Sequence, residues 1–152
     1  MGFYDWMLSL HVLSAAAMGV ALVLFTMLVL TSRRLRSIEE ADVNFRLGGI
    51  GGIVIGVGSV AALIFGIVLA IDSEDYHPWD GWVIAAIVLW AILGALGGRS
   101  GRYYTETERI AKEGRADEAL ARLQAPIGPT LVLVSDALFA LILLDMLFKP
   151  GA

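Results

Sequence analysis

The sequence predicts an all-α integral membrane protein that crosses a bilayer four times as a four-helix bundle. Hydrophobic residues make up 58% of the 152 residues and charged residues only 17%. The mean hydropathy of +0.77 is also too high for a water-soluble domain of ordinary composition. Four runs contain few or no charged residues, and each is long enough to span a hydrocarbon core of about 30 Å at about 1.5 Å per residue.

The four spans are expected at residues 7–30, 48–71, 81–98 and 127–148, within a single transmembrane domain covering residues 1–152. The first three contain no Asp, Glu, Lys or Arg, and the fourth contains Asp136 and Asp145. The first span is expected to be retained rather than cleaved. Asp5 precedes it and no Lys or Arg does, whereas a signal peptide begins with a basic region.

The distribution of charge predicts the orientation. The connection before residue 48 contains Arg33, Arg34, Arg36 and Arg46, and the connection 99–126 contains six further Lys and Arg residues. The connection 72–80 contains acidic residues and no basic one. Because Lys and Arg gather in cytoplasmic loops, the first and third connections are expected in the cytoplasm and both termini outside.

The polar segment 99–126 is predicted to be a cytoplasmic helical connector that breaks at Gly114. Opposite charges stand four residues apart at Arg102–Glu106, Glu108–Lys112, Arg109–Glu113 and Glu118–Arg122. Asp117 is expected to cap the second helical piece, and Pro126 marks the entry into the last span. We interpret the connector as solvated, with a docking surface or an anionic-lipid contact as the alternative.

Small residues gather on one predicted face of the second span, where helix backbones could approach closely. They are Gly48, Gly51, Gly52, Ser59, Ala62, Gly66 and Ala70. Gly94 and Gly98 belong to a shorter stripe in the third span. We expect both stripes to be helix-packing seams. No Lys-Ser or Lys-Thr follows the glycines, which excludes a phosphate-binding loop.

Two carboxylates in the last span are candidate functional groups, because charges inside a membrane are costly. Asp136 is expected near the midplane, level with Met18, and either protonated or hydrogen-bonded to Ser59 or Ser135. Asp145 is expected about one turn inside the outer end, at the depth of His11. It either reaches water or orients the imidazole of His11, as carboxylates commonly do.

His11, near the outer end of the first span, is the third intramembrane candidate. It could be a haem or metal ligand, a proton-relay group or a polar contact between helices. An outer-face metal site built from His11, His77 and Met7 is a further arrangement, although no spacing motif supports it. A mid-membrane haem held by two histidines is excluded, because the spans contain only one histidine.

Several function classes are excluded by what the sequence lacks. The chain contains no cysteine, so disulfides, thiolate metal ligands and iron–sulfur clusters are excluded. It also contains no motif typical of serine hydrolases, P-loop proteins, zinc proteases or dinucleotide-binding enzymes. A nucleic-acid partner is not expected. The partners we expect are the lipid bilayer and either a second copy of the chain or a membrane-complex subunit.

Short motifs along most of the chain resemble an uncharacterised bacterial family of predicted four-span integral membrane proteins. They are Leu8-Ser9-Leu10-His11-Val12-Leu13-Ser14-Ala15 leading to Met18-Gly19, an arginine-rich turn, a glycine-rich second span and Asp80-Gly81-Trp82. More distantly, the context of His11 is similar to copper-resistance D proteins and HemJ-type protoporphyrinogen oxidases. In those proteins a first-helix histidine is implicated in haem binding or redox chemistry, and the resemblance therefore implies His11 as a candidate ligand of haem b.

Three functional hypotheses follow. The favoured one is a non-enzymatic structural or accessory bundle, placed as a multi-pass protein in a bacterial inner (plasma) membrane. The second is a haem- or metal-binding redox protein that uses His11. The third is a proton-coupled or solute-conducting element that uses Asp136.

Overall fold

The computed structural model describes residues 2–73 and 75–150, and these residues are predominantly helical. The elements are α1 (Phe3–Ser32), a short 3-10 helix (Glu39–Ala41), α2 (Asp42–Asp72), α3 (Gly81–Lys112), α4 (Ala116–Gln124) and α5 (Ile127–Phe148). Helices α1, α2, α3 and α5 are each long and apolar enough to cross a membrane. The predicted all-α fold with four membrane-spanning helices is therefore confirmed.

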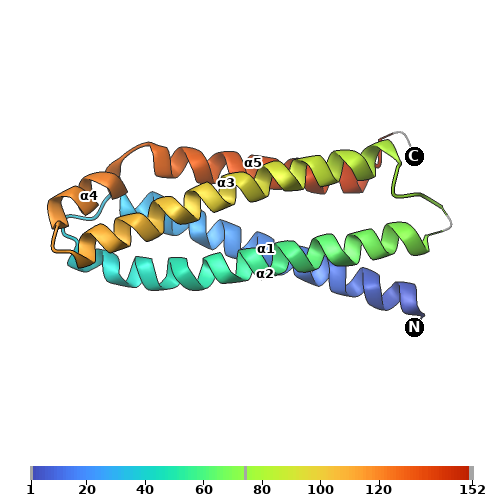
Figure 1. Cartoon of the computed structure of the whole chain (residues 1–152), viewed down its shortest axis with the longest axis horizontal. Coiled ribbons are helices and arrows are strands. Elements are labelled where there is room, and N and C mark those ends of the chain that lie inside the picture. Colours follow the sequence, from blue (N-terminus) through green and yellow to red (C-terminus); the bar gives the residue numbers. More distant parts are fainter. Residues whose placement is uncertain (1, 74, 151–152) are drawn as a thin grey trace.

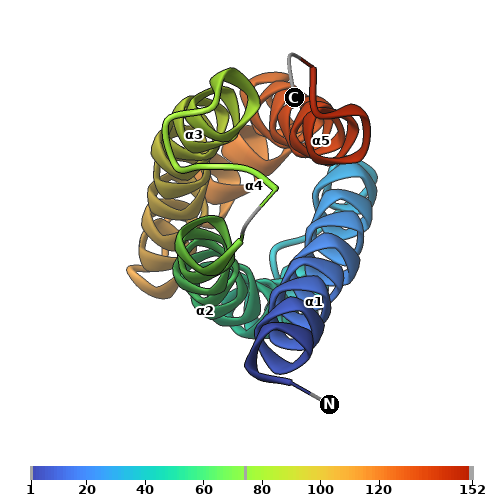
Figure 2. The same ribbon diagram turned by 90° about the vertical axis from the view of Figure 1, so that its right-hand side faces the viewer.

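The four long helices lie side by side, with α4 at one end of the bundle and both chain ends at the other (Figure 1). Seen along the bundle, they follow one another in the order α1, α2, α3, α5 (Figure 2). The most extensive contacts are those between α1 and α2 and those between α3 and α5, whereas α2 and α3 touch little. The bundle thus consists of two antiparallel helix pairs packed against each other.

The core of the bundle lies midway along the helices. Met18 of α1, Leu93 of α3 and Ile142 of α5 form a buried cluster, and Ile55 of α2 packs against it. Large apolar side chains on the outward faces remain exposed, among them Leu13 (66%), Ile53 (68%) and Leu147 (74%). Water-soluble proteins rarely expose apolar faces of this extent, and a surrounding lipid phase accounts for them.

Two helices continue past the predicted spans at the α4 end. Helix α2 begins at Asp42, six residues before the predicted span, and α3 continues to Lys112 rather than ending at residue 98. Hydropathy marks where a helix leaves the apolar phase and does not mark where the helix itself ends. The polar extension of α3 is supported by intrahelical ion pairs, each of which stabilises a helix by about 0.2–0.5 kcal/mol.

Two of the four predicted ion pairs are present, Glu108–Lys112 at 2.6 Å and Arg109–Glu113 at 2.9 Å. The other two, Arg102–Glu106 and Glu118–Arg122, do not form within the described residues, because Glu106 pairs with Arg109 and Glu118 with Arg115.

The helical connector breaks at Gly114, as predicted. The φ of Gly114 is +82°, a backbone conformation that favours glycine. Its N–H donates to the Ala111 carbonyl at 3.1 Å, and the N–H of Arg115 donates to the Ile110 carbonyl at 3.2 Å. These two bonds define a Schellman motif that ends α3.

The prediction that Asp117 caps α4 is wrong. The cap residue is Arg115, and the acidic Asp117 lies in the first turn instead.

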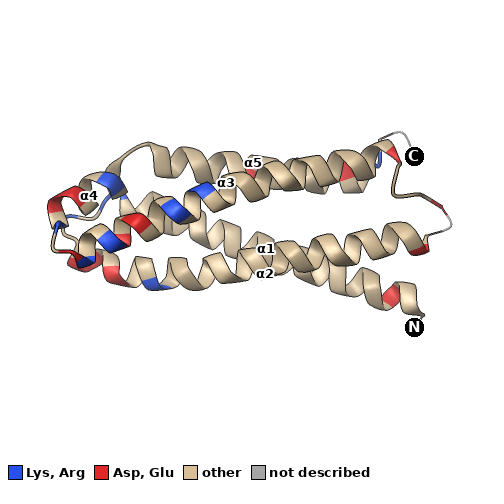
Figure 3. Ribbon diagram, viewed as in Figure 1, with Lys and Arg blue, Asp and Glu red and all other residues tan. Residues whose placement is uncertain are grey.

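Basic side chains gather at the α4 end of the bundle (Figure 3). Of the eleven Lys and Arg residues, ten belong to the two connections at this end and their flanking helices, and only Lys149 stands at the opposite end. There the ammonium of Lys149 lies over the aromatic rings of Tyr76 and Trp82, at 4.6 and 5.4 Å from the ring centroids. The structure therefore places ten of the eleven basic residues at one end, together with eight of the fifteen acidic ones, and leaves the other end with a single cation that lies over two aromatic rings.

Candidate functional site

The imidazole of His11 lies between α1 and α2. Its Nδ1 is 2.8 Å from the backbone carbonyl oxygen of Ala62. A carbonyl oxygen only accepts hydrogen bonds, so Nδ1 carries a proton in this contact, and in a neutral ring Nε2 would be the nitrogen with the lone pair. A Cβ at Gly66 would lie 3.0 Å from Cε1 of the ring. Gly66 follows Ala62 by one helical turn, so the absence of a side chain there opens the Ala62 carbonyl to the histidine.

The structure does not pair His11 with Asp145. Met18 clusters with Ile142, and a Cβ at Gly19 would meet the ring of Phe139. In this antiparallel register Asp145 is level with residue 15 of α1, four residues or about 6 Å deeper than His11. The two residues therefore lie at different depths. The Oδ2 atom of Asp145 is buried and has no hydrogen-bond partner among the described residues.

Asp136 links α5 to α1. Its Oδ2 accepts a hydrogen bond of 2.9 Å from the hydroxyl of Thr26, which is itself buried. Its Oδ1 is buried without a partner among the residues that the structure describes. The expected depth was wrong, since the α5 residue that packs with Met18 is Ile142 rather than Asp136. Six residues, or about 9 Å, separate the two along the helix, so Asp136 lies toward the basic end.

Neither expected partner of Asp136 is available to it. The hydroxyl of Ser135 donates to the Leu131 carbonyl of its own helix at 2.9 Å. Ser59 of α2 is engaged with α3, because the indole Nε1 of Trp90 donates to the Ser59 hydroxyl at 2.8 Å and to its carbonyl at 3.2 Å. Trp90 therefore provides a polar link between α2 and α3, two neighbouring helices that otherwise touch little.

The residues predicted to form packing seams divide into two groups. Gly48 lies against the ring of Phe25, Gly66 lies against His11, and Ala62 is buried at 8% exposure. By contrast, a Cβ added at Gly52, Gly94 or Gly98 would meet nothing within 4 Å. These three glycines are exposed and do not pack against another helix of the chain.

Among the glycines of α2, only Gly58, which the sequence did not single out, would bring an added Cβ against backbone atoms of α1. A Cβ there would lie 3.1 Å from the carbonyl oxygen of Ser14 and 3.2 Å from the Cβ of Met18. At about 100° per residue the glycines in the first part of α2 cover about half of the helix circumference, so spacing along that helix alone cannot select the one that meets α1. Which glycine of α2 lies against α1 depends on the side chains of α1.

The described residues provide no converging set of ligands for a metal ion and one candidate ligand, His11, for a haem. Within residues 2–73 and 75–150 no group of three or more His, Cys, Asp or Glu side chains converges as a metal site would require. In a neutral ring Nε2 of His11 would be the one nitrogen that could hold a haem iron. The hydrogen bond from Nδ1 to a backbone carbonyl is the arrangement that orients such ligands.

Two further polar residues, Thr26 and Trp90, were not predicted from the sequence, and only the structure shows what they bind. Thr26 is one of the few hydroxyl residues in the first span, and its role depends on the register between α1 and α5. Trp90 is a tryptophan placed well inside a span rather than in an interfacial belt, and this position was the available signal for a buried donor.

Comparison with family models, with curated proteins and with solved structures found no match to this chain.

Proposed function

We propose that this chain is a non-enzymatic bundle of a bacterial inner membrane that serves as a structural or accessory element. The single observation that supports this proposal is how the polar groups within the spans are used. His11 joins α1 to α2, Trp90 joins α3 to α2, and Thr26 joins α1 to α5. Each of these hydrogen bonds holds two helices together, which is a structural use.

The proposed orientation places the α4 end in the cytoplasm and both termini outside. It rests on the ten Lys and Arg residues at that end, since basic residues in short loops are retained on the cytoplasmic side. Aromatic residues mark the membrane interface at the other end, but aromatic belts occur on both sides of a membrane and do not set the orientation. Trp79 is exposed there, and Tyr4 and Tyr76 share a hydrogen bond of 3.0 Å.

The proposal is tested by purifying the chain from cells supplied with haem and metals and recording its absorption spectrum and metal content. We expect no Soret band and no stoichiometric metal. His11→Ala should lower the free energy of unfolding by about 0.6–1.7 kcal/mol, the range for interhelical hydrogen bonds in membranes. His77→Ala, at the only other histidine, is the control and should leave stability unchanged, because His77 is exposed in the loop before α3.

A second candidate function, a haem-binding redox protein, is favoured by the tautomer of His11. The Ala62 carbonyl fixes the proton on Nδ1 and leaves Nε2 free to coordinate iron. A Soret band that His11→Ala abolishes and His77→Ala retains would establish this function and contradict the first proposal.

A further inference from the structure

An open cavity lies at the basic end of the bundle, where α3 leaves the apolar phase and α5 begins. Its volume is about 570 Å³, and three arginines line it, Arg99 and Arg102 from α3 and Arg122 from α4. The uncharged part of α3 ends at Gly98, so Arg99 and Arg102 stand at the level where lipid headgroups meet the hydrocarbon core.

The positive charge of this cavity is not neutralised from within the protein. Its only carboxylate is Glu106, and both oxygens of Glu106 accept hydrogen bonds from Arg109, at 3.1 and 2.5 Å. These bonds hold the pKa of the Glu106 carboxyl below its usual value. Among the described residues no carboxylate forms an ion pair with Arg99 or Arg102.

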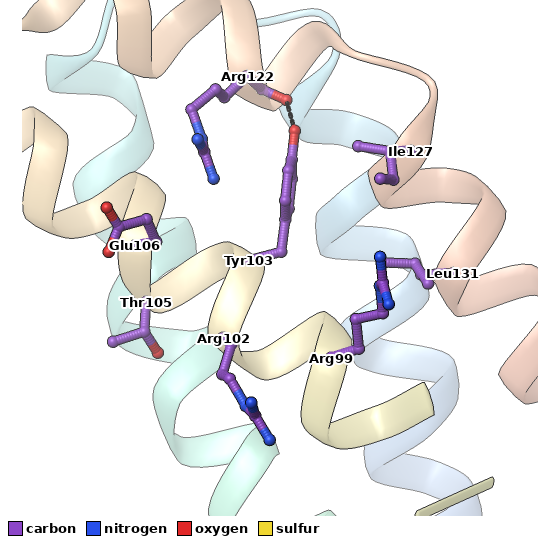
Figure 4. Close-up of a pocket in the computed structure, with 8 residues that line it drawn as sticks. All are labelled: Arg99, Arg102, Tyr103, Thr105, Glu106, Arg122, Ile127 and Leu131. Atoms are coloured by element: carbon purple, nitrogen blue, oxygen red, sulfur yellow. Dashed lines mark hydrogen bonds between the residues drawn. The ribbon is translucent and has the colours of Figure 1, made fainter. Parts of the chain in front are cut away.

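The third arginine is held in place by its neighbours. The guanidinium of Arg122 lies 4.9 Å from the ring centroid of Tyr103, and its Nε donates to the hydroxyl of Thr107 at 3.2 Å. The hydroxyl of Tyr103 donates to the Arg122 carbonyl at 2.6 Å, as Figure 4 shows. Burial raises the pKa of Tyr103, so this hydroxyl remains a neutral donor. The cavity therefore contains a preorganised cation.

The opposite wall of the cavity is apolar. Ile127 and Leu131 line it from the first turns of α5, and Ile127 is 43% exposed. Figure 4 shows the side chain of Arg99 extending from α3 toward Leu131. The cavity thus combines three guanidinium groups with aliphatic side chains, and this combination matches an amphiphile with an anionic head and hydrocarbon chains.

We propose that this cavity binds the phosphate headgroup of an anionic phospholipid from the adjacent leaflet. Guanidinium groups bind phosphate oxygens through paired, charge-assisted hydrogen bonds, and basic pockets between membrane helices are known to accept such headgroups. Arg99 and Arg102, which form no ion pair among the described residues, supply two of the contacts, Arg122 supplies the third, and Ile127 and Leu131 meet the upper part of the acyl chains. The proposal requires only that the helices span a bilayer and is independent of the accessory role proposed above.

The test measures the binding of phosphatidylglycerol to the purified, delipidated full chain by native mass spectrometry, with phosphatidylcholine as the neutral reference. The double variant Arg99→Gln/Arg102→Gln removes two charges from the cavity. Its control, Arg34→Gln/Arg36→Gln, removes two exposed charges at the same end but outside the cavity. We expect the first variant to bind phosphatidylglycerol about 30-fold more weakly, and the control to change binding by less than about threefold.

Equal weakening in the two double variants would mean that general surface charge attracts the lipid, and this result would overturn the proposal. An unchanged affinity in the cavity variant would overturn it as well. A separate measurement tests whether inorganic phosphate competes with the lipid for the cavity. If it competes with the lipid at equal concentration, the site takes a soluble anion and the lipid assignment is wrong. If the double variant does not fold, Arg99→Gln is compared with Arg34→Gln, and a loss of about fivefold is expected.

Discussion

Replacing Gly58 by alanine places a methyl group against the backbone of α1, in the interface between α1 and α2. The new Cβ would lie 3.1 Å from the Ser14 carbonyl oxygen, 3.2 Å from the Met18 Cβ and 3.5 Å from the Met18 Cα. Two of these three atoms belong to the backbone of α1, so a side-chain rotation cannot relieve the contact. The two helices have to separate along a seam that continues on both sides of Gly58.

Gly52→Ala is the matched control, because it adds the same methyl group to the same helix where nothing lies within 4 Å. Both variants gain the same helix propensity, so the difference between them isolates the steric effect. Overpacking by one methyl group costs about 1–3 kcal/mol, equivalent to a factor of about 5 to 150 in the unfolding equilibrium constant. Gly58→Ala should therefore unfold at a distinctly lower SDS fraction than Gly52→Ala in mixed micelles, followed by tryptophan fluorescence.

The reasoning would be refuted by two variants that unfold at the same SDS fraction. That result would mean that α1 and α2 are not in backbone contact at Gly58. A selective loss in Gly52→Ala would instead place the seam on the face of α2 that the structure leaves open.

Three further predictions concern the polar contacts. Thr26→Val should lower the free energy of unfolding by about 0.6–1.7 kcal/mol, because Asp136 loses its hydrogen bond, and Thr26→Ser should restore most of the stability; equal losses would contradict this. Ser59→Ala and Trp90→Phe should be non-additive in a double-mutant cycle, and additive losses would exclude their coupling. Burial, aided by the hydrogen bond with Tyr4, raises the pKa of Tyr76 from 10.0 to about 12. The folded chain therefore keeps a proton that the unfolded chain releases, and its stability should fall as the pH rises from about 10 to 12, with Tyr76→Phe flattening this dependence.

The sequence predicted the membrane helices well, because long apolar runs have few other stable structures. The bounds of the last span, residues 127–148, coincide with α5. The prediction for the third span failed at its polar end, where α3 continues for fourteen residues beyond residue 98. That extension is stabilised by ion pairs and by the lack of a strong helix stop before Gly114, and hydropathy reports neither property.

The contacts of the polar residues were less predictable, because they depend on how the helices are offset along the bundle. Depths were inferred from the distance of each residue to the end or the middle of its predicted span, which placed Asp136 level with Met18 and Asp145 level with His11. In the structure Met18 packs with Ile142 instead. Because α5 is shifted along α1 in this way, Asp136 is not level with Met18 and Asp145 is not level with His11. Small-residue spacing similarly identified Gly48 and Gly66 but could not distinguish Gly58 from Gly52, because the bulky partners belong to a different helix.

The measurement that tests the central claim most directly is the side of the membrane on which each end of α2 lies. The chain contains no cysteine, so single cysteines at Ser37 and Ser73 can be labelled selectively. An impermeant thiol reagent applied outside intact cells should label the variant at Ser73 and should reach Ser37 only after lysis. Labelling of both positions from outside would show that α2 does not cross the membrane, and labelling of Ser37 alone would show that the bundle is inserted the other way.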